Sequence, residues 1–396
     1  MTLLSLGHAC VDIYQGAVAA LVPFFVSERA YTYAAASGIV LAVSLLSSVV
    51  QPLFGALTDK WAMPWLLPAS TLLGGAGVAL SGVVGSYALT LTVIAVSGIG
   101  IAAYHPEAAR AARAAGRGSH TAMSWFSLGG NLGFAAGPLM VSAVIATGGL
   151  RASPLLAVPA LAGAALSAAA LRAVRAPGAK AAAAGASEAT ARDDWSSFVT
   201  LSGAIVCRSI VFVGLSTFIS LYARQRTGGG DLSGTAALFV LYLGGAVGTV
   251  AGGKLATRYG RIGVVRWSYA LTVLAVAGVV YVPGPSLYLF VALASAGLYV
   301  PFSLHITLGQ DYLPRRVGTA AGVTMGLAVS VGGLAGPLVG AMADAMTLQT
   351  ALAPLIALPA LGWVLLRTLR EPAAAPPAPA PASAPDPGPA GATETA

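Results

Sequence analysis

The sequence predicts an all-α integral membrane protein with twelve transmembrane helices arranged as two pseudo-symmetric six-helix bundles. Three observations predict this fold class: an apolar composition, twelve apolar stretches of membrane-spanning length, and an internal repeat. Of the 396 residues, 57% are hydrophobic and only 9% are charged. Because roughly a quarter of the residues of a soluble protein are charged, this composition excludes a water-soluble fold.

The apolar stretches are bounded by charged residues, proline or glycine, and each approaches or exceeds the roughly 20 residues that a helix needs to cross a bilayer. Six lie near 3–27, 33–57, 64–85, 87–108, 119–146 and 150–172, and six more near 197–223, 232–257, 262–282, 285–310, 317–343 and 348–370. We expect a first bundle over 1–172, a linker over 173–196 and a second bundle over 197–371. Residues 372–396 are rich in Pro and Ala and cannot build a core, so we expect a disordered tail.

The basic residues fall unequally on the two sides of the predicted membrane. Most of the 21 Lys and Arg residues lie on one side, and only Arg29, Arg151, Arg224 and Arg226 lie on the other. Because basic residues are retained in the cytoplasm, we expect both termini, the linker and the tail of this multi-pass protein to be cytoplasmic. The dispersed basic residues form no stripe that nucleic acid would bind.

The two halves of the sequence match each other in register. Gly55-Ala-Leu-Thr-Asp-Lys60 follows the second span, and Gly253-Lys-Leu-Ala-Thr-Arg258 follows the eighth. Gly137-Pro138 and Gly336-Pro337 recur at nearly the same offset. A duplicated six-helix unit predicts a binding site between the two bundles.

Ionisable side chains within the first span are candidates for proton coupling, because charges inside a membrane are costly and usually functional. His8, Asp12 and Gln15 share one helical face, with Asp12 near the middle of the span. We expect Asp12 to carry the coupled proton, assisted by His8. A fixed ion pair that only holds the halves together is the alternative.

Arg208 is the basic residue that lies well inside a span. That span, the seventh, is the repeat counterpart of the first span. Its planar guanidinium suits a carboxylate, phosphate or phosphonate, so we expect it to bind an anionic substrate or to pair with Asp12 across the interface. A structural arginine is the alternative. Other polar or aromatic residues inside spans are further substrate-site candidates: Tyr14, Gln15, Ser124, Ser127, Asn131, Phe212 and His305. For the serines and the asparagine, hydrogen bonding between helices is the alternative.

The segment Tyr104-His105-Pro106-Glu107 ends the fourth span. His105 and Glu107 could relay protons, since histidine titrates near neutral pH. Alternatively, Glu107 pairs with Arg110 or Arg113 in a gate at the membrane surface. The sequence leaves both interpretations open.

The segment GALTDK, with its degenerate copy GKLATRYGR, resembles the loop signature of the major facilitator superfamily. The resemblance implies that Asp59, next to Lys60, braces the cytoplasmic ends of the bundles and that Gly55 allows close helix approach. The Gly-rich segment ending in Gly137-Pro138 resembles that of antiporters of this superfamily. Four stretches look like those of the fosmidomycin resistance family of proton-coupled exporters: GHACVDIYQG, QPLFGALTDKWAMPWLLP, YHPEAARAAR and SLGGNLGFAAGPL.

The residues and the resemblance together predict a proton-coupled antiporter that exports a small polar or anionic compound, such as a fosmidomycin-like phosphonate, by alternating access. We expect a monomer that is not an enzyme and uses no cofactor besides the proton gradient, because no GxxxxGK[ST] motif occurs. The histidines lie on different spans, so we expect no metal site. A proton-coupled uptake symporter or uniporter for a small organic acid, and a non-transporting receptor or scaffold, are the alternatives.

Overall fold

The structure is a computed structural model that describes residues 1–61, 63–116, 120–174 and 193–372, and these residues form helices and short connections. The first half contains α1 (Thr2–Arg29), α2 (Tyr33–Lys60), α3 (Leu66–Ser81), α4 (Tyr87–Ala115), α5 (His120–Gly148) and α6 (Val158–Val174), with the 3-10 helix Gly149–Ala157 before α6. The second half contains α7 (Trp195–Thr227), α8 (Gly230–Tyr259), α9 (Arg261–Tyr281), α10 (Leu287–Tyr299), α11 (Phe302–Tyr312), α12 (Val317–Ala345), α13 (Leu348–Leu352) and α14 (Ala357–Leu366).

These helices make up the twelve predicted spans, because α10 with α11 and α13 with α14 each form one span. Nine described stretches are long and apolar enough to cross a membrane, and one of them, Trp125–Arg172, contains both α5 and α6. Two shorter apolar helices, Leu66–Ser81 and Val331–Ala345, complete the set. The prediction of an all-α membrane fold is confirmed, while residues 175–192 of the linker and 373–396 of the tail lie outside the described residues.

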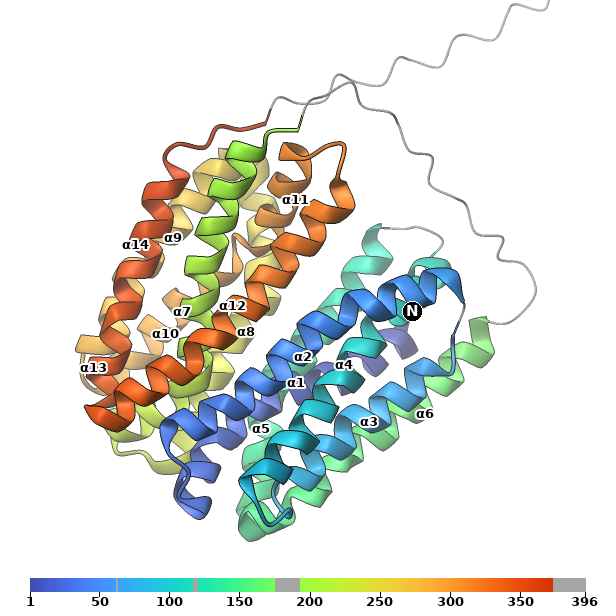
Figure 1. Cartoon of the computed structure of the whole chain (residues 1–396), viewed down its shortest axis with the longest axis vertical. Coiled ribbons are helices and arrows are strands. Elements are labelled where there is room, and N and C mark those ends of the chain that lie inside the picture. Colours follow the sequence, from blue (N-terminus) through green and yellow to red (C-terminus); the bar gives the residue numbers. More distant parts are fainter. Residues whose placement is uncertain (62, 117–119, 175–192, 373–396) are drawn as a thin grey trace, which may run out of the picture.

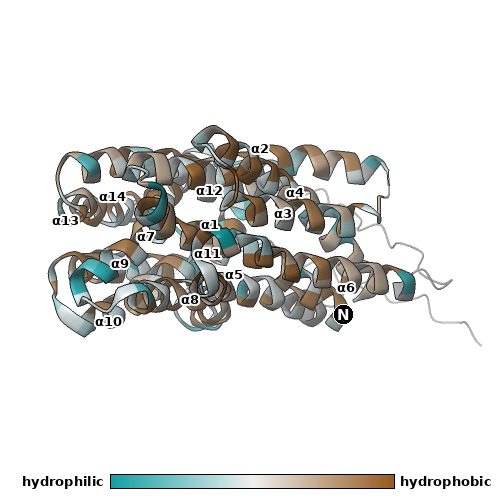
Figure 2. Ribbon diagram, turned by 90° about the horizontal axis from the view of Figure 1, so that it is seen from below, coloured by the Kyte–Doolittle hydropathy of each residue, from teal (hydrophilic) through white to brown (hydrophobic). Residues whose placement is uncertain are grey.

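Two bundles lie side by side in Figure 1, α1–α6 in one and α7–α14 in the other, with α1, α2 and α5 next to α7, α8 and α12. Large apolar side chains cover the outside of the helices: Trp267 is 78% exposed and Leu274 is 70% exposed. Figure 2 shows hydrophobic residues along the lengths of the helices. Lipid solvates such a surface, whereas water would not.

Local signals set the ends of several helices. The hydroxyl of Thr32 accepts a hydrogen bond from the Ala35 N–H (3.1 Å) at the start of α2. The carboxylate of Asp194 accepts a hydrogen bond from the Ser197 N–H (3.0 Å) at the start of α7. This hydrogen bond holds the pKa of Asp194 below its ordinary value. Gly228, at φ 65°, ends α7 in the left-handed conformation.

The tenth predicted span is not one continuous helix. The sequence predicted a single helix over 285–310, but α10 ends at Tyr299 and α11 begins at Phe302. Pro301 has no backbone N–H and cannot continue the hydrogen-bond ladder. By contrast, α4 runs without interruption through Pro106.

Glycines bring α5 against α1 with backbone touching backbone. A Cβ on Gly129 would lie 2.3 Å from Ser5 O, and one on Gly133 would lie 2.1 Å from Ala9 O. Gly137 continues the same face, where a Cβ would lie 2.6 Å from Ile13 O, and Pro138 follows it within α5. Small residues at this spacing allow the closest helix packing in a membrane.

The bundles are hydrogen-bonded to each other at the end where α1 leads into α2, which we call the turn end. The carboxylate of Asp344 on α12 accepts hydrogen bonds from the N–H groups of Tyr33 (2.7 Å) and Ala34 (2.9 Å), the first residues of α2. Gln225 Nε2 donates to the hydroxyl of Tyr33 at 3.3 Å. The opposite end, where α6 leads to α7, is the linker end.

Candidate functional site

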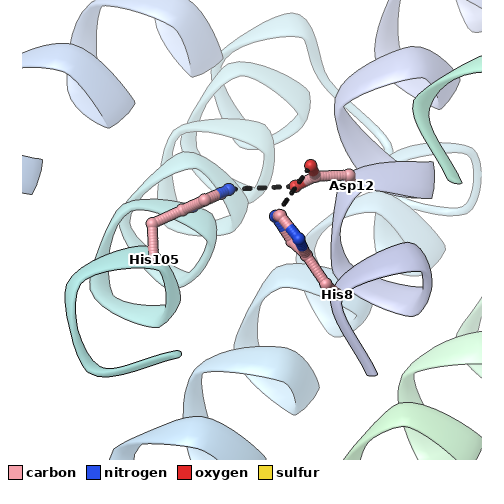
Figure 3. A group of neighbouring side chains, drawn as sticks. All are labelled: His8, Asp12 and His105. Atoms are coloured by element: carbon pink, nitrogen blue, oxygen red, sulfur yellow. Dashed lines mark hydrogen bonds and ion pairs between the residues drawn. The ribbon is translucent and has the colours of Figure 1, made fainter. Parts of the chain in front are cut away.

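Three ionisable side chains of the first bundle meet between α1 and α4. Asp12 Oδ1 lies 3.0 Å from Nε2 of His105, and Asp12 Oδ2 lies 3.1 Å from Nε2 of His8 (Figure 3). We call these three residues the His–Asp cluster. His8 and Asp12 share a face of α1 because they are four residues apart, and α4 supplies His105.

The other nitrogen of each ring contacts a backbone carbonyl. Nδ1 of His8 lies 2.9 Å from Phe126 O, and Nδ1 of His105 lies 2.7 Å from Ile101 O. A carbonyl oxygen can only accept a hydrogen bond, so each Nδ1 carries a proton. In a neutral imidazole the remaining nitrogen, Nε2, then has a lone pair, and in both rings it faces Asp12.

Gly130 on α5 has no side chain, and the His–Asp cluster occupies the space that a side chain there would fill. A Cβ at Gly130 would lie 2.5 Å from Asp12 Oδ2 and 2.6 Å from Cε1 of His8. The ring of His8 also stacks on Phe126 with centroids 4.2 Å apart. The packing of α5 against α1 therefore fixes the position of the His8 ring and the surroundings of one carboxylate oxygen of Asp12, Oδ2.

The His–Asp cluster touches the wall of a cavity between the bundles through Gln15. Gln15 Nε2 lies 3.5 Å from Asp12 Oδ1, and its side chain lines a cavity of about 90 Å³. The lining includes hydroxyl and aromatic groups from both bundles. It consists of Gln15, Val18, Ala19, Val40, Val43, Ser44, Ser47 and Phe134 from the first bundle and Phe212, Val213, Ser216 and Tyr242 from the second.

Arg208 does not pair with Asp12, so that expectation is wrong. Its Nη1 donates to Leu298 O at 2.8 Å, and its guanidinium lies 5.3 Å from the ring centre of Phe302. Within the described part of the chain it has no carboxylate partner at ion-pair distance. The carboxylate of Asp12 contacts His8 and His105, which the fold places beside it in the position that was expected for Arg208.

Two other groups near Arg208 are buried in the second bundle. Both ring nitrogens of His305 and the hydroxyl of Tyr299 have no hydrogen-bond partner among the described residues. His305 packs against the ring of Tyr269 at 5.8 Å, and Tyr299 packs against Phe212 at 5.4 Å. His305 therefore lies behind the cavity wall and not on it.

The other substrate-site candidates divide by location. Phe212 and Gln15 line the cavity. Tyr14 does not, because it is fully buried and its hydroxyl donates to Leu156 O at 2.7 Å within the first bundle. Ser127 is exposed and Asn131 is half-buried, and neither is part of the cavity lining.

The residues expected near the linker end give a mixed result. Glu107 is buried and Arg110 Nε donates to it at 2.9 Å, which matches the pairing alternative and not a relay to Asp12. Gly55 has no described atom within 4 Å of its Cβ position, so no close approach of a described helix occurs there in this conformation. Lys60 lies over the ring of Trp61 at 4.6 Å. The side chains of Asp59, Arg113 and Ser124 lie outside the described part of the chain.

Sequence reasoning missed Tyr299 and Asp344. Tyr299 lies within an apolar stretch without a charge to mark it. Gly130 lies in the Gly-rich segment of the fifth span, but its contact with His8 and Asp12 was not predicted. Asp344 carried a detectable signal, since it is an acidic residue near the end of the eleventh predicted span. Its hydrogen-bond partner, however, is a backbone N–H group at the start of α2, more than 300 residues earlier in the chain. No side-chain pattern encodes that contact.

The composition of the His–Asp cluster is also that of a metal site, since its donor atoms lie within 4.8 Å of one another. The sequence indicated no such group because the histidines are on different spans, and the fold brings two of them together. Each carboxylate oxygen faces its own ring, however, Oδ1 facing His105 and Oδ2 facing His8. These are two separate contacts, a hydrogen bond between His105 and Oδ1 and an ion-pair contact between His8 and Oδ2.

Comparison with known proteins gives consistent matches over nearly the whole chain. A profile described as Major Facilitator Superfamily matches residues 4–337. The chain is 29% identical over 370 residues to the fosmidomycin resistance protein of Escherichia coli (strain K12), covering 91% of this chain and 90% of that protein. It is also 29% identical over 374 residues to the MFS-type transporter YfnC of Bacillus subtilis (strain 168), covering 91% and 90%.

Solved transporter structures share the fold. A point mutant of the nucleoside transporter NupG superposes with a TM-score of 0.76 at 12% identity, covering 93% of this chain and 99% of that one. A bacterial homologue of the human lysosomal transporter Spinster, in an inward-facing and unoccupied conformation, superposes with a TM-score of 0.75 at 14% identity, covering 92% and 96%.

Proposed function

This chain belongs to the major facilitator superfamily, and we propose that it is a proton-coupled antiporter that exports a small polar or anionic compound across a bacterial inner membrane. It is a multi-pass membrane transporter and not an enzyme. The observation that carries the proposal is the contact of the His–Asp cluster with Gln15 on the wall of a cavity between the bundles.

The His–Asp cluster supports proton coupling through its hydrogen-bond pattern. With both Nδ1 atoms donating to carbonyls, the Nε2 lone pairs of neutral rings would face the lone pairs of an ionised Asp12 at 3.0 and 3.1 Å. Such contacts repel, so this arrangement requires protons between the rings and the carboxylate. Loss of these protons would separate the rings from Asp12 and free Gln15 to move.

The cavity supports alternating access by its position and its size. Both bundles contribute to its wall, so a rocking motion of one bundle against the other changes its shape. Its volume of about 90 Å³ is below the roughly 300–1,000 Å³ of ordinary small-molecule sites. Substrate entry therefore requires the bundles to separate.

The turn end faces the outside in this proposal, as the distribution of Lys and Arg favours. The hydrogen bonds of Asp344 to Tyr33 and Ala34 then close the outer side. Export is favoured by the similarity to the fosmidomycin resistance protein. We expect the transporter to work as a monomer, with both bundles and the cavity supplied by one chain.

The test is transport by the purified full-length chain in lipid vesicles with an imposed pH gradient. An antiporter accumulates labelled fosmidomycin on the acidic side, while a symporter accumulates it on the alkaline side. Asp12→Asn should abolish gradient-driven accumulation but leave downhill exchange of substrate. Asp231→Asn is the matched control, because Asp231 pairs with Arg224 at 2.7 Å within the second bundle. Unchanged accumulation by Asp12→Asn would show that the proton does not travel through the cluster.

A further inference from the structure

The second bundle contains a buried positive charge that no described carboxylate balances. Arg208 is 4% exposed, and its Nε has no hydrogen-bond partner among the described residues. Beside it, His305 is 2% exposed, and within the same described residues neither of its ring nitrogens nor the buried hydroxyl of Tyr299 has a partner. We call these three residues the Arg208 group. Native proteins rarely leave so many buried polar atoms unpaired, and a ligand site is a principal reason when they do.

The break between α10 and α11 places the end of one helix and the start of another beside Arg208. The guanidinium of Arg208 lies over Phe302, the first residue of α11, and donates to Leu298 O just before the break. The first N–H groups of a helix have no intrahelical acceptor and form the positive end of its dipole. In transporters, the starts of interrupted helices commonly point at acidic substrate groups.

The group lies close to the cavity. Phe212 and Val213, which line the cavity, follow Arg208 by about one helical turn on α7. Tyr299 contacts Phe212 of the cavity wall, and it directly follows Leu298, whose carbonyl accepts a hydrogen bond from Arg208. A rotation of the Phe212 and Tyr299 rings would therefore connect the cavity with the guanidinium.

We propose that the Arg208 group binds the acid end of a small anion, a carboxylate, phosphate or phosphonate, and so selects anions as the transported class. The inference rests on the proposed transport function, and it names the substrate class. Arg208 Nε donates to one acid oxygen, the Tyr299 hydroxyl donates to a second, and a neutral His305 donates one ring N–H. The charge of Arg208 is available to such an anion because Asp12 is held by His8 and His105.

Calorimetric titration of the full-length protein in lipid nanodiscs tests the site directly, at constant ionic strength and with inorganic phosphate, methylphosphonate and acetate as probes. At least one probe should bind with one-to-one stoichiometry. Arg208→Gln should weaken it by about tenfold or more, the value of one charge-assisted hydrogen bond, and Tyr299→Phe by about fivefold. Arg208→Lys should fall between wild type and Arg208→Gln. Arg224→Gln, on the same helix but paired with Asp231, should bind like wild type.

Thermal unfolding without ligand separates a binding role from a structural one. Removing an unbalanced buried charge should leave the Tm of Arg208→Gln unchanged or raised, whereas loss of a structural arginine would lower it. Absence of binding by all three probes, or wild-type affinity in both Arg208 variants, would overturn the inference. If wild-type vesicles exchange protons while no anion binds, this inference fails alone. If anions bind through Arg208 but no pH gradient drives transport, the proposed function fails alone.

Discussion

The two bundles place ionisable groups at equivalent positions, about one helical turn from the cavity, but they balance the charge differently. In the first bundle, Asp12 lies between His8 and His105. In the second, Arg208 lacks a described carboxylate partner, and the ring nitrogens of His305 lack a hydrogen-bond partner among the described residues. The repeat therefore supplies similar positions twice, and in the functions proposed above the first bundle binds the proton while the second binds the anion.

The largest expected effect comes from substituting the two repeat-related histidines separately. His105→Gln removes a proton-bearing ring that contacts Asp12, so gradient-driven transport should fall by about tenfold or more. His305→Gln should weaken substrate affinity and leave the pH dependence of transport unchanged. Initial transport rates across a range of pH measure both effects. Similar pH profiles for the two variants would mean that the bundles do not divide the chemistry.

A substitution beside the cluster tests whether its geometry matters as well as its composition. Gly130→Ala places a methyl group 2.5 Å from Asp12 Oδ2, and such overpacking costs about 1–3 kcal/mol unless the cluster shifts. We expect a loss of several-fold in gradient-driven transport, with less effect on downhill exchange. Gly263→Ala on α9 is the matched control, since no described atom lies within 4 Å of its Cβ position. Equal behaviour of the two alanine variants would argue against a geometric requirement.

The hydrogen bonds between the bundles at the turn end should bias the conformational equilibrium by a smaller amount. Asp344→Asn removes a charge from the N-terminus of α2, worth about 0.3–1 kcal/mol when exposed. The population open at the turn end should therefore rise by a factor of roughly two to five. Spin-label distances between α2 and α12 would measure this shift. Asp231→Asn, at the same end but paired within its own bundle, should leave the distances unchanged.

No effect is expected from removing metal ions. Each oxygen of Asp12 faces its own ring, and we expect the cluster to bind protons and not one shared ion. Transport by vesicles treated with a chelator should equal that of untreated vesicles. A requirement for added zinc would instead assign His8, Asp12 and His105 to a metal.

Sequence patterns predicted the helices well because the bilayer imposes their length and hydrophobicity on local stretches of chain. The predicted start of the second span, residue 33, is the observed start of α2. The failures occur where a single residue acts on the backbone. Pro106 and Pro301 are both prolines within predicted spans, yet α4 continues and the tenth span breaks. Tertiary packing, which the sequence pattern does not encode, separates these outcomes.

The candidate site was predictable in its parts and not in its pairing. The spacing of His8, Asp12 and Gln15 on one helix placed them on one face, and their contacts follow that spacing. The distance from Asp12 to His105 or to Arg208 depends on how α1, α4 and α7 pack, so the expected pair across the bundles was wrong. Tyr14 was expected in the substrate site but does not line the cavity, for a related reason. Its position on α1 directs its side chain into the interior of the first bundle.

The glycine contacts of α5 with α1 have a mechanical consequence. Gly129 and Gly133 leave no side chain between the two backbones, so neither helix can slide or rotate without its partner. Because Phe126 O of α5 contacts the His8 ring, the helices that carry His8 and Asp12 move together with α5. In the proposed transport cycle, the first bundle can then rock as one body and expose the His–Asp cluster first to one side of the membrane and then to the other.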